Sequence, residues 1–239
     1  MRRILPSITT HGLRADSNWH TKLGEITRLG IDQCALFVTG VKSTDRPALF
    51  SALLAASKHR PFRIPFVHAV SNMAPAEFEF LISNFGTERF NLHPVSEFPL
   101  SHALDAELRS RIFIENASPD RALTAADLHG FAGLCVDISH LEEMRLNRLE
   151  AFQRFLPALA AFPIGANHIS AVRTERAGEA PLSVHLFQDL EDFRYLQQYS
   201  AAVFADICAL ELENPIQEQL DAIKFIEELL AIPSVKAAA

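Results

Sequence analysis

The sequence predicts an α/β fold, a (β/α)8 TIM barrel, and three observations point to it. Short apolar runs rich in β-branched and aromatic residues alternate with longer segments whose apolar residues recur at helical spacing. Eight such units fit in 239 residues, a usual length for this barrel. No Gly-Ser linker, low-complexity tract or block of charge divides the chain, so residues 1–239 are expected to form one domain. A doubly wound open sheet is the alternative, because periodicity alone cannot show that a sheet closes.

The eight expected strands leave room for a helix after each of them. They comprise residues 4–10, 33–40, 63–70, 89–95, 111–117, 133–139, 163–171 and 205–213. The helical segments expected between them include residues 45–59, 74–85, 123–132, 141–162 and 187–202. The last expected helix, 215–232, begins with Pro215, which is favoured there because the first N–H groups of a helix have no partner within it.

The composition indicates a large core and a small-molecule partner. Hydrophobic residues make up 49% of the chain, and the formal net charge is -7, the wrong sign for binding nucleic acid without compensating patches. The three cysteines (Cys34, Cys135 and Cys208) lie in apolar runs and are expected to be reduced, as in a cytoplasmic protein. No segment reaches about 18 uncharged apolar residues, so no membrane span is expected.

Ionisable residues recur where the expected strands end. In the stretch GLCVDISH (133–140), an apolar run leads directly into an aspartate and then a histidine. The carboxyl ends of barrel strands meet on one face, so residues far apart in the sequence can line one pocket. Imidazole nitrogens and carboxylate oxygens are ligands of divalent metals. The candidates on the third to eighth strands are His68, His93, Glu115, Asp137 with His140, His168, and Glu213.

Each of these residues also has an ordinary structural interpretation. A single histidine such as His68 among apolar neighbours is more often a core or surface residue than a ligand. Glu115 precedes Asn116, which could simply cap the following helix. The whole series decides between the two interpretations, because burying several carboxylates and imidazoles together without a cation costs several kcal/mol. A metal site on one face of the barrel is therefore the prediction.

Six short motifs carry a resemblance to a known superfamily. FVHAVSN, NLHPVS, FIENAS, CVDISH, NHISA and LELENP resemble, in this order, the strand-end motifs of the xylose isomerase-like TIM barrels. This superfamily includes endonuclease IV-type AP endonucleases and sugar isomerases and epimerases, and the resemblance covers residues 64 to 230. It implies that Glu115, Asp137, His168 and Glu213 hold a central metal. Glu211 points to the same strand face, but Glu213 is preferred because it lies nearer the tip and ENP resembles the family's E-x-P.

The resemblance also implies roles for further residues. Phosphoesterase members hold additional metal ions, for which His68 and His93 match one pair of ligands, and His140 and His185 match ligands of a third ion. Ser183 stands where the family's D-x-H motif has its aspartate, and serine is a poor ligand. The third site would therefore be empty, weakened, or completed by Asp189.

The additional histidines favour a hydrolase as the first prediction. The expected enzyme is a divalent-metal-dependent hydrolase of a small phosphoester with a di- or trinuclear site, in which a metal-bound water attacks phosphorus. Glu115, Glu213 and His140 are the expected catalytic residues, and Arg173 is expected to bind the phosphate. Zinc is the first choice of ion, and manganese, cobalt and iron accept the same ligands.

Two alternatives remain open. A mononuclear sugar or sugar-acid isomerase or epimerase would transfer protons through Glu115 and Glu213, while His68 and His93 contact substrate hydroxyls. A barrel that binds a ligand without turnover is the third interpretation. Neither the substrate, the number of metal ions nor association with a second subunit follows from the residues, because one barrel hosts many reactions.

Overall fold

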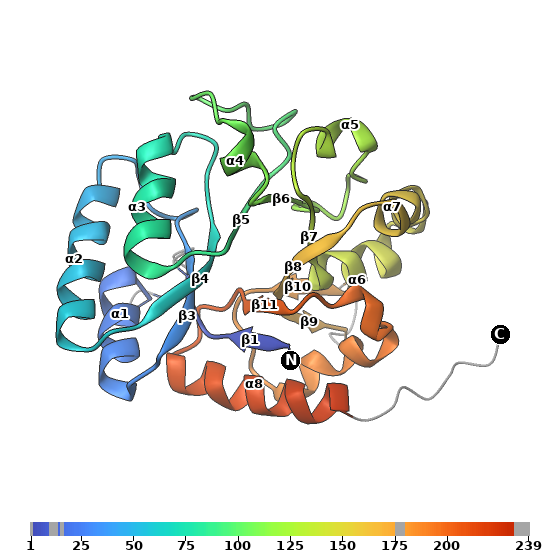
Figure 1. The fold of residues 1–239 in the computed structure, drawn as a ribbon. Coiled ribbons are helices and arrows are strands. Elements are labelled where there is room, and N and C mark those ends of the chain that lie inside the picture. Colours follow the sequence, from blue (N-terminus) through green and yellow to red (C-terminus); the bar gives the residue numbers. More distant parts are fainter. Residues whose placement is uncertain (1, 10–13, 15–16, 175–179, 232–239) are drawn as a thin grey trace.

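The chain forms a closed barrel of parallel strands surrounded by helices (Figure 1). The computed structural model describes residues 2–9, 14, 17–174 and 180–231. The order of the strands in the sheet is β1-β11-β8-β7-β6-β5-β4-β3-β2. Because β1 and β2 are consecutive pieces of one N-terminal strand, this order describes a ring of eight strands. The predicted (β/α)8 barrel is confirmed, and the open doubly wound sheet is excluded.

All eight expected strands are present, most of them shorter than the apolar runs that predicted them. Their bounds are β1 Arg3–Leu5 with β2 Ser7–Ile8, β3 Gln33–Phe37, β4 Arg63–His68, β5 Arg89–Leu92, β6 Ile112–Glu115, β7 Gly133–Asp137, β8 Ile164–Ile169 and β11 Ile207–Leu210. Thr10, at the end of the first expected strand, lies outside the described residues. A small antiparallel pair that the sequence did not predict, β9 (Ala171–Arg173) with β10 (Leu182–Val184), follows β8.

The helices differ more from expectation than the strands do. Their bounds are α1 Trp19–Leu29, α2 Arg46–His59, α3 Pro75–Phe85, α4 Ala106–Arg109, α5 Ala125–Leu128, α6 Ile138–Asn147, α7 Leu149–Ala161 and α8 Ile216–Ala231, with the 3-10 helices η1 Leu190–Gln198 and η2 Ala201–Val203. The expected helix 141–162 is broken at Arg148, which leaves the helical conformation (φ -140°, ψ 56°). The break allows Met144 of α6 and Phe155 of α7 both to pack into the core.

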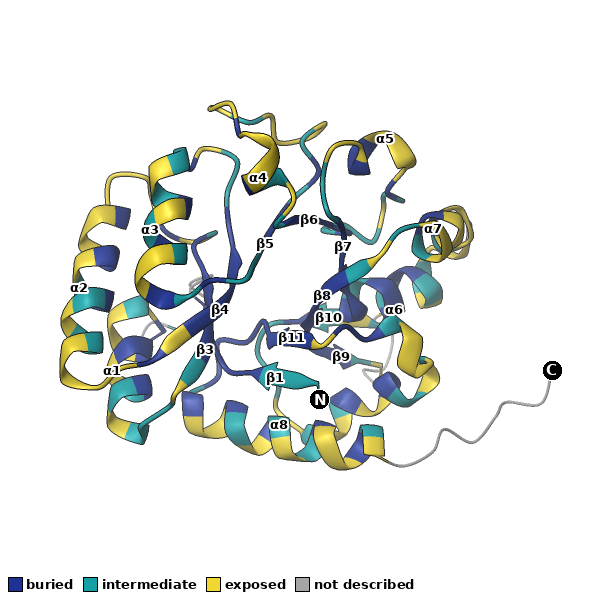
Figure 2. Ribbon diagram, viewed as in Figure 1, coloured by how far each residue is buried: buried dark blue, intermediate teal, exposed yellow. Residues whose placement is uncertain are grey.

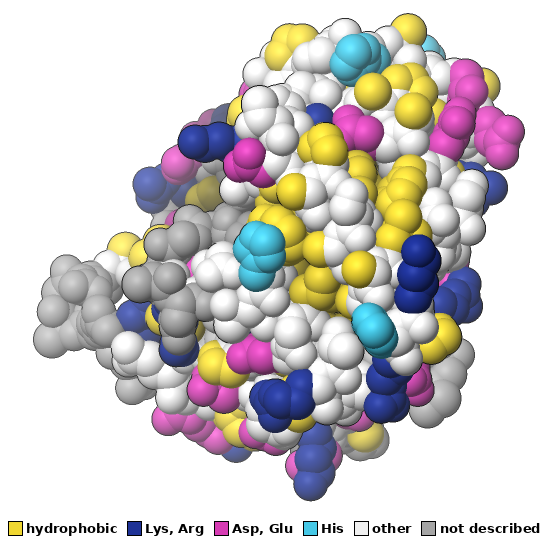
Figure 3. Space-filling view, turned by 90° about the vertical axis from the view of Figure 1, so that its left-hand side faces the viewer, with side chains coloured by type: hydrophobic (Ala, Val, Ile, Leu, Met, Phe, Trp, Pro, Cys, Tyr) yellow, Lys and Arg dark blue, Asp and Glu magenta, His cyan; other side chains and the backbone are white. Residues whose placement is uncertain are grey.

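Two clusters of buried apolar side chains make up the core. One fills the barrel and includes Phe37, Phe66 and Phe113, and the other lies between the strands and the helices. In Figure 2 the strands are mostly buried, and the helices around them are exposed on their outer sides. A side chain at Gly165 would overlap the Phe113 ring, so glycine is needed at this point of β8. The three cysteines are buried and form no disulfide. On the face of the molecule shown in Figure 3, apolar atoms lie among charges of both signs.

None of the helices described here is both long enough and apolar enough to cross a membrane.

The ring closes where the first strand is interrupted at Pro6. On one side β1 pairs with β11, and on the other β2 pairs with β3. Gln219 of α8, which is fully buried, lies across this seam. Its side-chain oxygen accepts from the Ser7 N–H (2.7 Å), and its nitrogen donates to the carbonyls of Ser7 (3.2 Å), Leu212 (3.0 Å) and Asn214 (3.0 Å). One carboxamide therefore connects the first strand with the segment that follows the last strand.

Removing the Gln219 hydrogen bonds at the seam is expected to lower the stability of the protein. In Gln219→Leu the buried backbone groups of Ser7 and Leu212 lose their partner, so the free energy of unfolding is expected to fall by about 2–4 kcal/mol. Urea denaturation followed by circular dichroism measures this. The matched control is Gln217→Leu on the exposed side of the same helix, with an expected change within about 0.5 kcal/mol. Equal effects of the two substitutions would show that Gln219 does not secure the seam.

Candidate metal centre

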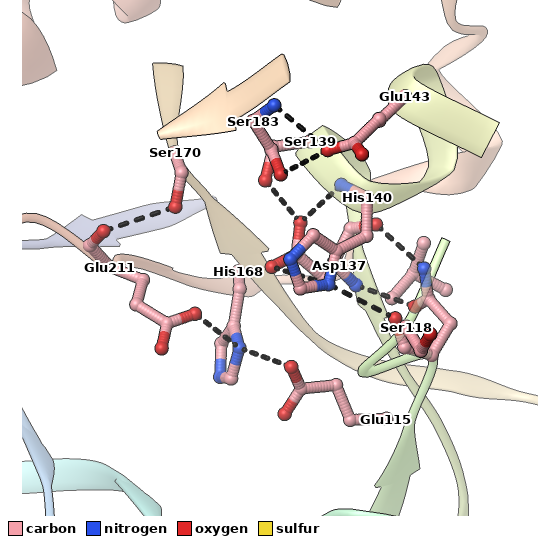
Figure 4. A network of polar contacts seen from close by, with 12 residues as sticks. Glu115, Ser118, Asp137, Ser139, His140, Glu143, His168, Ser170, Ser183 and Glu211 are labelled. Atoms are coloured by element: carbon pink, nitrogen blue, oxygen red, sulfur yellow. Dashed lines mark hydrogen bonds and ion pairs between the residues drawn. The ribbon is translucent and has the colours of Figure 1, made fainter. Parts of the chain in front are cut away.

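Four ionisable side chains from four neighbouring strand ends converge at the carboxyl end of the barrel. Glu115 ends β6, Asp137 ends β7, His168 lies near the end of β8, and Glu211 follows β11. Each offers one ligand atom, and these atoms lie within 4.8 Å of one another (Figure 4). All four residues are at most 3% exposed. Parallel pairing of these four strands therefore brings together side chains that are up to 96 positions apart in the sequence.

Asp137 is oriented by the start of α6 and by a neighbouring asparagine. Its Oδ1 caps α6 by accepting from the His140 N–H (2.9 Å) and the Ser139 hydroxyl (2.5 Å). Its backbone makes two reciprocal hydrogen bonds with the Asn116 carboxamide, at 2.8 and 2.9 Å. The Oδ2 atom has no hydrogen-bond partner among the described residues. The local contacts thus use one carboxylate oxygen and leave the other for the cluster.

Glu115 and Glu211 lie on either side of His168 (Figure 4). The Nδ1 atom of His168 is 3.3 Å from a carboxylate oxygen of Glu115 and 3.4 Å from one of Glu211. The Asn91 side-chain amide donates to Oε2 of Glu115, whereas Oε1 is the oxygen nearer to His168. The Glu211 carbonyl accepts from the Ser170 hydroxyl at 3.0 Å, which fixes the backbone at this point.

Glu211 belongs to the converging group, whereas Glu213, the glutamate preferred from the sequence, has no ligand atom in it among the described residues. Because β11 ends at Leu210, the two-residue alternation that would put both glutamates on one face does not continue to position 213. The Glu213 N–H instead donates to the His185 carbonyl (2.7 Å), and its carboxylate accepts from the Arg14 N–H (3.2 Å). Glu213 lines a separate small cavity together with Lys22, whose pKa burial lowers to about 8.

His68 extends the cluster on the side of β4. Its Nε2 atom is 3.4 Å from Glu115, and its Nδ1 atom is 4.0 Å from Glu211. The rings of His68 and His168 lie above Phe37, with centroid distances of 5.4 and 4.9 Å. Among the described residues, no ring nitrogen of either histidine makes a hydrogen bond of good geometry. Both imidazoles are thus held by apolar packing from below and face the carboxylates with their nitrogens.

The protonation equilibria reflect burial and close charges. Burial lowers the pKa of His68 to about 3, although Glu115 opposes this shift. Burial also disfavours the charged form of Glu115, but His168 and His68 outweigh it and hold the pKa of Glu115 below its usual range. The pKa of His140 is raised, because Asp137, Glu115 and Glu211 outweigh the effect of its burial. The electrostatic potential at the cluster is therefore negative.

The donor set fits a divalent cation. Three carboxylates and an imidazole are ligands that first-row divalent ions accept. Asp137 Oδ2 and the His168 nitrogens are buried polar atoms without hydrogen bonds among the described residues, which is costly unless another group satisfies them. A cation held by Glu115, Asp137, His168 and Glu211 would satisfy these atoms and offset the repulsion between the carboxylates.

Two of the remaining predicted residues lie beside the cluster. His93 is half-buried, and its ring centroid is 4.9 Å from that of His68, but it does not belong to the groups of ligand atoms that converge in the described chain. The His140 Nδ1 atom is 3.7 Å from Asp137 Oδ2 and faces the Asn116 carbonyl at 3.3 Å. Both histidines line the edge of the group of four.

The residues expected at a third metal ion lie in other arrangements. Ser183 donates its N–H and hydroxyl to one oxygen of Glu143, at 2.9 and 2.6 Å (Figure 4). The Nδ1 atom of His185 faces the Glu211 carbonyl at 3.0 Å and the Ser170 hydroxyl at 3.2 Å, so it lies against the backbone beside the cluster. Asp189 caps η1 by accepting from the Glu191 N–H.

Arg173 lies in a different cleft from the cluster. This cleft, of about 650 Å³, is lined by residues 172–174 together with charged residues of 188–194, including Asp189 and Asp192. Another cleft, of about 740 Å³, opens at the opposite end of the barrel and is lined by Arg89, Phe113 and their neighbours. Neither cleft includes a residue of the group of four.

Three residues that shape the cluster do not follow from the sequence motifs. Glu211 is the less favoured of two glutamates there, and the motifs assign no role in the cluster to Asn91 or Asn116. Asn116 had a visible signal, because an amide directly after a strand-end glutamate can bond the backbone of the next strand. Asn91 lies inside β5, and only the pairing of β5 with β6 shows that its side chain reaches Glu115.

Comparisons with known proteins agree with this fold. No family model and no curated protein matches the chain. Among solved structures, the IolI protein with a bound zinc atom is 14% identical, with a TM-score of 0.52 over 97% of this chain and 98% of that one. A xylose isomerase domain protein from Alicyclobacillus acidocaldarius is 12% identical, with a TM-score of 0.51 over 96% and 99%. The predicted TIM-barrel fold is confirmed by these similarities, which at this identity concern the fold alone.

The low pKa of His68 predicts a change of stability with pH. Between about pH 3 and 6.5 the unfolded chain takes up a proton at His68 that the folded chain does not, so the free energy of unfolding falls as the pH falls. In metal-free protein, His68→Gln is expected to reduce this slope by up to about 1.4 kcal/mol per pH unit.

Urea denaturation at a series of pH values, with chelator present, gives the slopes. His59→Gln, at an exposed position of α2, is the matched control. If His68→Gln and wild type show parallel curves over this range, His68 is not neutral in the folded protein at low pH.

Proposed function

We propose that the protein is a divalent-metal-dependent isomerase or epimerase of a sugar or sugar acid. The observation that carries this proposal is the group of four ligand atoms from Glu115, Asp137, His168 and Glu211 within 4.8 Å of one another. Such a group is suited to a single cation. Two of its carboxylates come from opposite sides of His168, an arrangement that can serve proton transfer at a carbon beside an oxygen bound to the cation.

The two glutamates would share the proton transfer. A bound divalent ion would polarise a substrate carbonyl or hydroxyl and so make the neighbouring C–H more acidic. Glu115 and Glu211 lie on either side of His168. One carboxylate would remove the proton from the substrate carbon, and the other would return a proton to it. The pKa of Glu115 lies below its usual range because His168 and His68 outweigh the effect of its burial, so its carboxylate is ionised.

Histidines at the edge of the cluster would bind the substrate's hydroxyl groups. His68 lies between Glu115 and Glu211, and His93 lies against the ring of His68 on the more exposed side. Neutral imidazole has one donor and one acceptor nitrogen, which suits hydroxyl groups. The low pKa of His68 supports the neutral form at this position.

Zinc is the first ion to test. The IolI protein with the similar fold carries a bound zinc atom, which supports this choice. Manganese, cobalt and iron accept the same set of carboxylates and imidazole, so the ligands alone do not select one of them.

The phosphoester hydrolase that the sequence placed first has less support. It needs a second ion held by His68 and His93, and His93 is not part of a converging ligand group among the described residues. It also needs a phosphate-binding arginine, and Arg173 lies in another cleft. Among the described residues, a second group of converging ligand atoms, from His68, Glu115 and His168, shares two of its three residues with the group of four. This overlap favours one ion over two, and the isomerase needs only one.

The number of ions and their ligands provide a first test. Purified protein dialysed against zinc is expected to contain about one ion per chain by elemental analysis. Glu211→Gln is expected to weaken zinc binding by more than about 100-fold, because losing a ligand costs more than losing a residue that only orients one, which costs about 10- to 100-fold. Competition with a zinc-binding dye measures the affinity.

Glu213→Gln is the matched control, since it changes a second buried glutamate two positions along the same chain segment. It is expected to keep the wild-type affinity. Two or three tightly bound ions per chain would instead favour the hydrolase, and loss of zinc binding in Glu213→Gln with retention in Glu211→Gln would refute the ligand assignment.

Proton exchange tests the reaction itself. Zinc-loaded protein is incubated in D2O with a panel of aldoses, ketoses and sugar acids, and NMR follows the replacement of C–H by C–D and the formation of an isomer. Glu115→Gln is expected to slow the exchange by about 10²- to 10⁴-fold, the usual contribution of a general base. Hydrolysis of bis-p-nitrophenyl phosphate with no exchange would support the hydrolase. The absence of both reactions would support a barrel that binds a ligand without turnover.

A further inference from the structure

The exposed apolar side chains of this protein are concentrated on one surface. Five large apolar residues are classed as exposed among the described ones, and four of them lie on α6, α7 and β10. These four, which we call the α6–α7 patch, are Leu146 (39% exposed), Leu149 (58%), Leu156 (41%) and Leu182 (52%). β10 lies beside α6, since Asn147 donates to the Pro181 carbonyl and Ser183 bonds Glu143. Scattered leucines are ordinary on a surface, but a cluster indicates a contact.

The pattern of α7 shows that this exposure is built into the helix. Ala151, Phe155 and Ala158 face the core, whereas Leu149 and Leu156 are seven residues apart and so lie on one line along the outer side. Half-buried Phe152 lies between them along this line. Figure 2 shows α7 at the edge of the molecule, with its outer side exposed. The helix thus has apolar residues on two sides, of which the structure buries one.

The charges beside this line are arranged symmetrically. Glu150 and Arg154 form an ion pair one turn apart (2.5 Å) on one flank of the line. In an antiparallel pair of α7 helices with a twofold axis between them near Phe152, position 150 of one copy faces position 154 of the other, and position 149 nearly faces position 156. Two antiparallel copies of α7 would therefore place Leu149 on Leu156 and Glu150 beside Arg154, each twice. This pattern is complementary to itself in shape and in charge.

We propose that two copies of this chain associate through the α6–α7 patch, with their α7 helices antiparallel about a twofold axis near Phe152. A surface that matches itself under a twofold rotation is what a symmetric dimer requires. The same pattern gives no advantage to a partner with a different sequence. Leu146 of α6 and Leu182 of β10 would add contacts beside the helix pair, which broadens the interface towards the area of a specific contact, about 1,000 Å² in total.

Sedimentation equilibrium over a concentration series provides the first test. Wild-type protein is expected to dimerise, and Leu156→Glu is expected to be monomeric, because two charges would face the apolar line of the partner. Phe98→Glu, at the exposed apolar residue outside the patch (46% exposed), is the matched control and is expected to dimerise as the wild type does. Circular dichroism confirms that each variant is folded. A monomeric wild type, or a dimer that Leu156→Glu leaves intact, would overturn the proposal.

A charge exchange tests the antiparallel arrangement. Glu150→Arg makes both positions on the flank positive, and Arg154→Glu makes both negative, so each variant alone is expected to dimerise at least about 10-fold more weakly than wild type through like-charge contacts. An equimolar mixture of the two is expected to form a heterodimer with near wild-type affinity. If the mixture associates no better than the separate variants, α7 does not pair with itself in this way.

Discussion

Closure of the barrel at its first strand is the constraint on which the rest of the structure depends. Pro6 divides that strand, so that β1 completes the ladder to β11 and β2 completes the ladder to β3. Gln219 holds the two sides together with hydrogen bonds to Ser7, Leu212 and Asn214. Closure also curves the sheet, so that His68 at the end of β4 faces Glu115 and Glu211 across the barrel.

Buried asparagines continue the sheet beyond the ends of its strands. The Asn116 carboxamide bonds the N–H and carbonyl of Asp137, and the Asn214 carboxamide bonds the same two groups of Phe187 at 3.1 Å each. The Asn167 carboxamide donates to the carbonyls of Val136 and Val203 and accepts from the Ala205 N–H. A carboxamide has the donor and acceptor of a peptide group, so it can satisfy a buried backbone where the ladder stops. The strand ends can therefore turn their ionisable side chains inward without leaving the backbone unsatisfied.

The cluster combines buried charged groups whose burial is unfavourable unless oppositely charged groups lie beside them. Three buried carboxylates repel, and burial alone disfavours their charged forms. His168 lies between Glu115 and Glu211, and Phe37 supports the imidazoles from inside the barrel. The apolar interior fixes the rings and excludes water, while the carboxylates supply the charge. The proposed cation is the remaining partner that this combination of groups requires.

The sequence by itself determined the order of the strands along the chain and most of the cluster, whereas periodicity left closure of the sheet open. Alternating apolar runs located all eight strands, and the strand-end motifs identified Glu115, Asp137 and His168, because a strand's face and its end are local properties of the chain. Tertiary structure decided which glutamate joins the cluster and which distant residues contact it. Alternation places Glu211 and Glu213 on one face, but the sheet stops at Leu210, so only the first glutamate points into the cluster. The partners of Asn91, Ser183 and Arg173 likewise depend on which distant segments the folded chain brings beside them. The spacing of residues along the sequence does not specify these contacts.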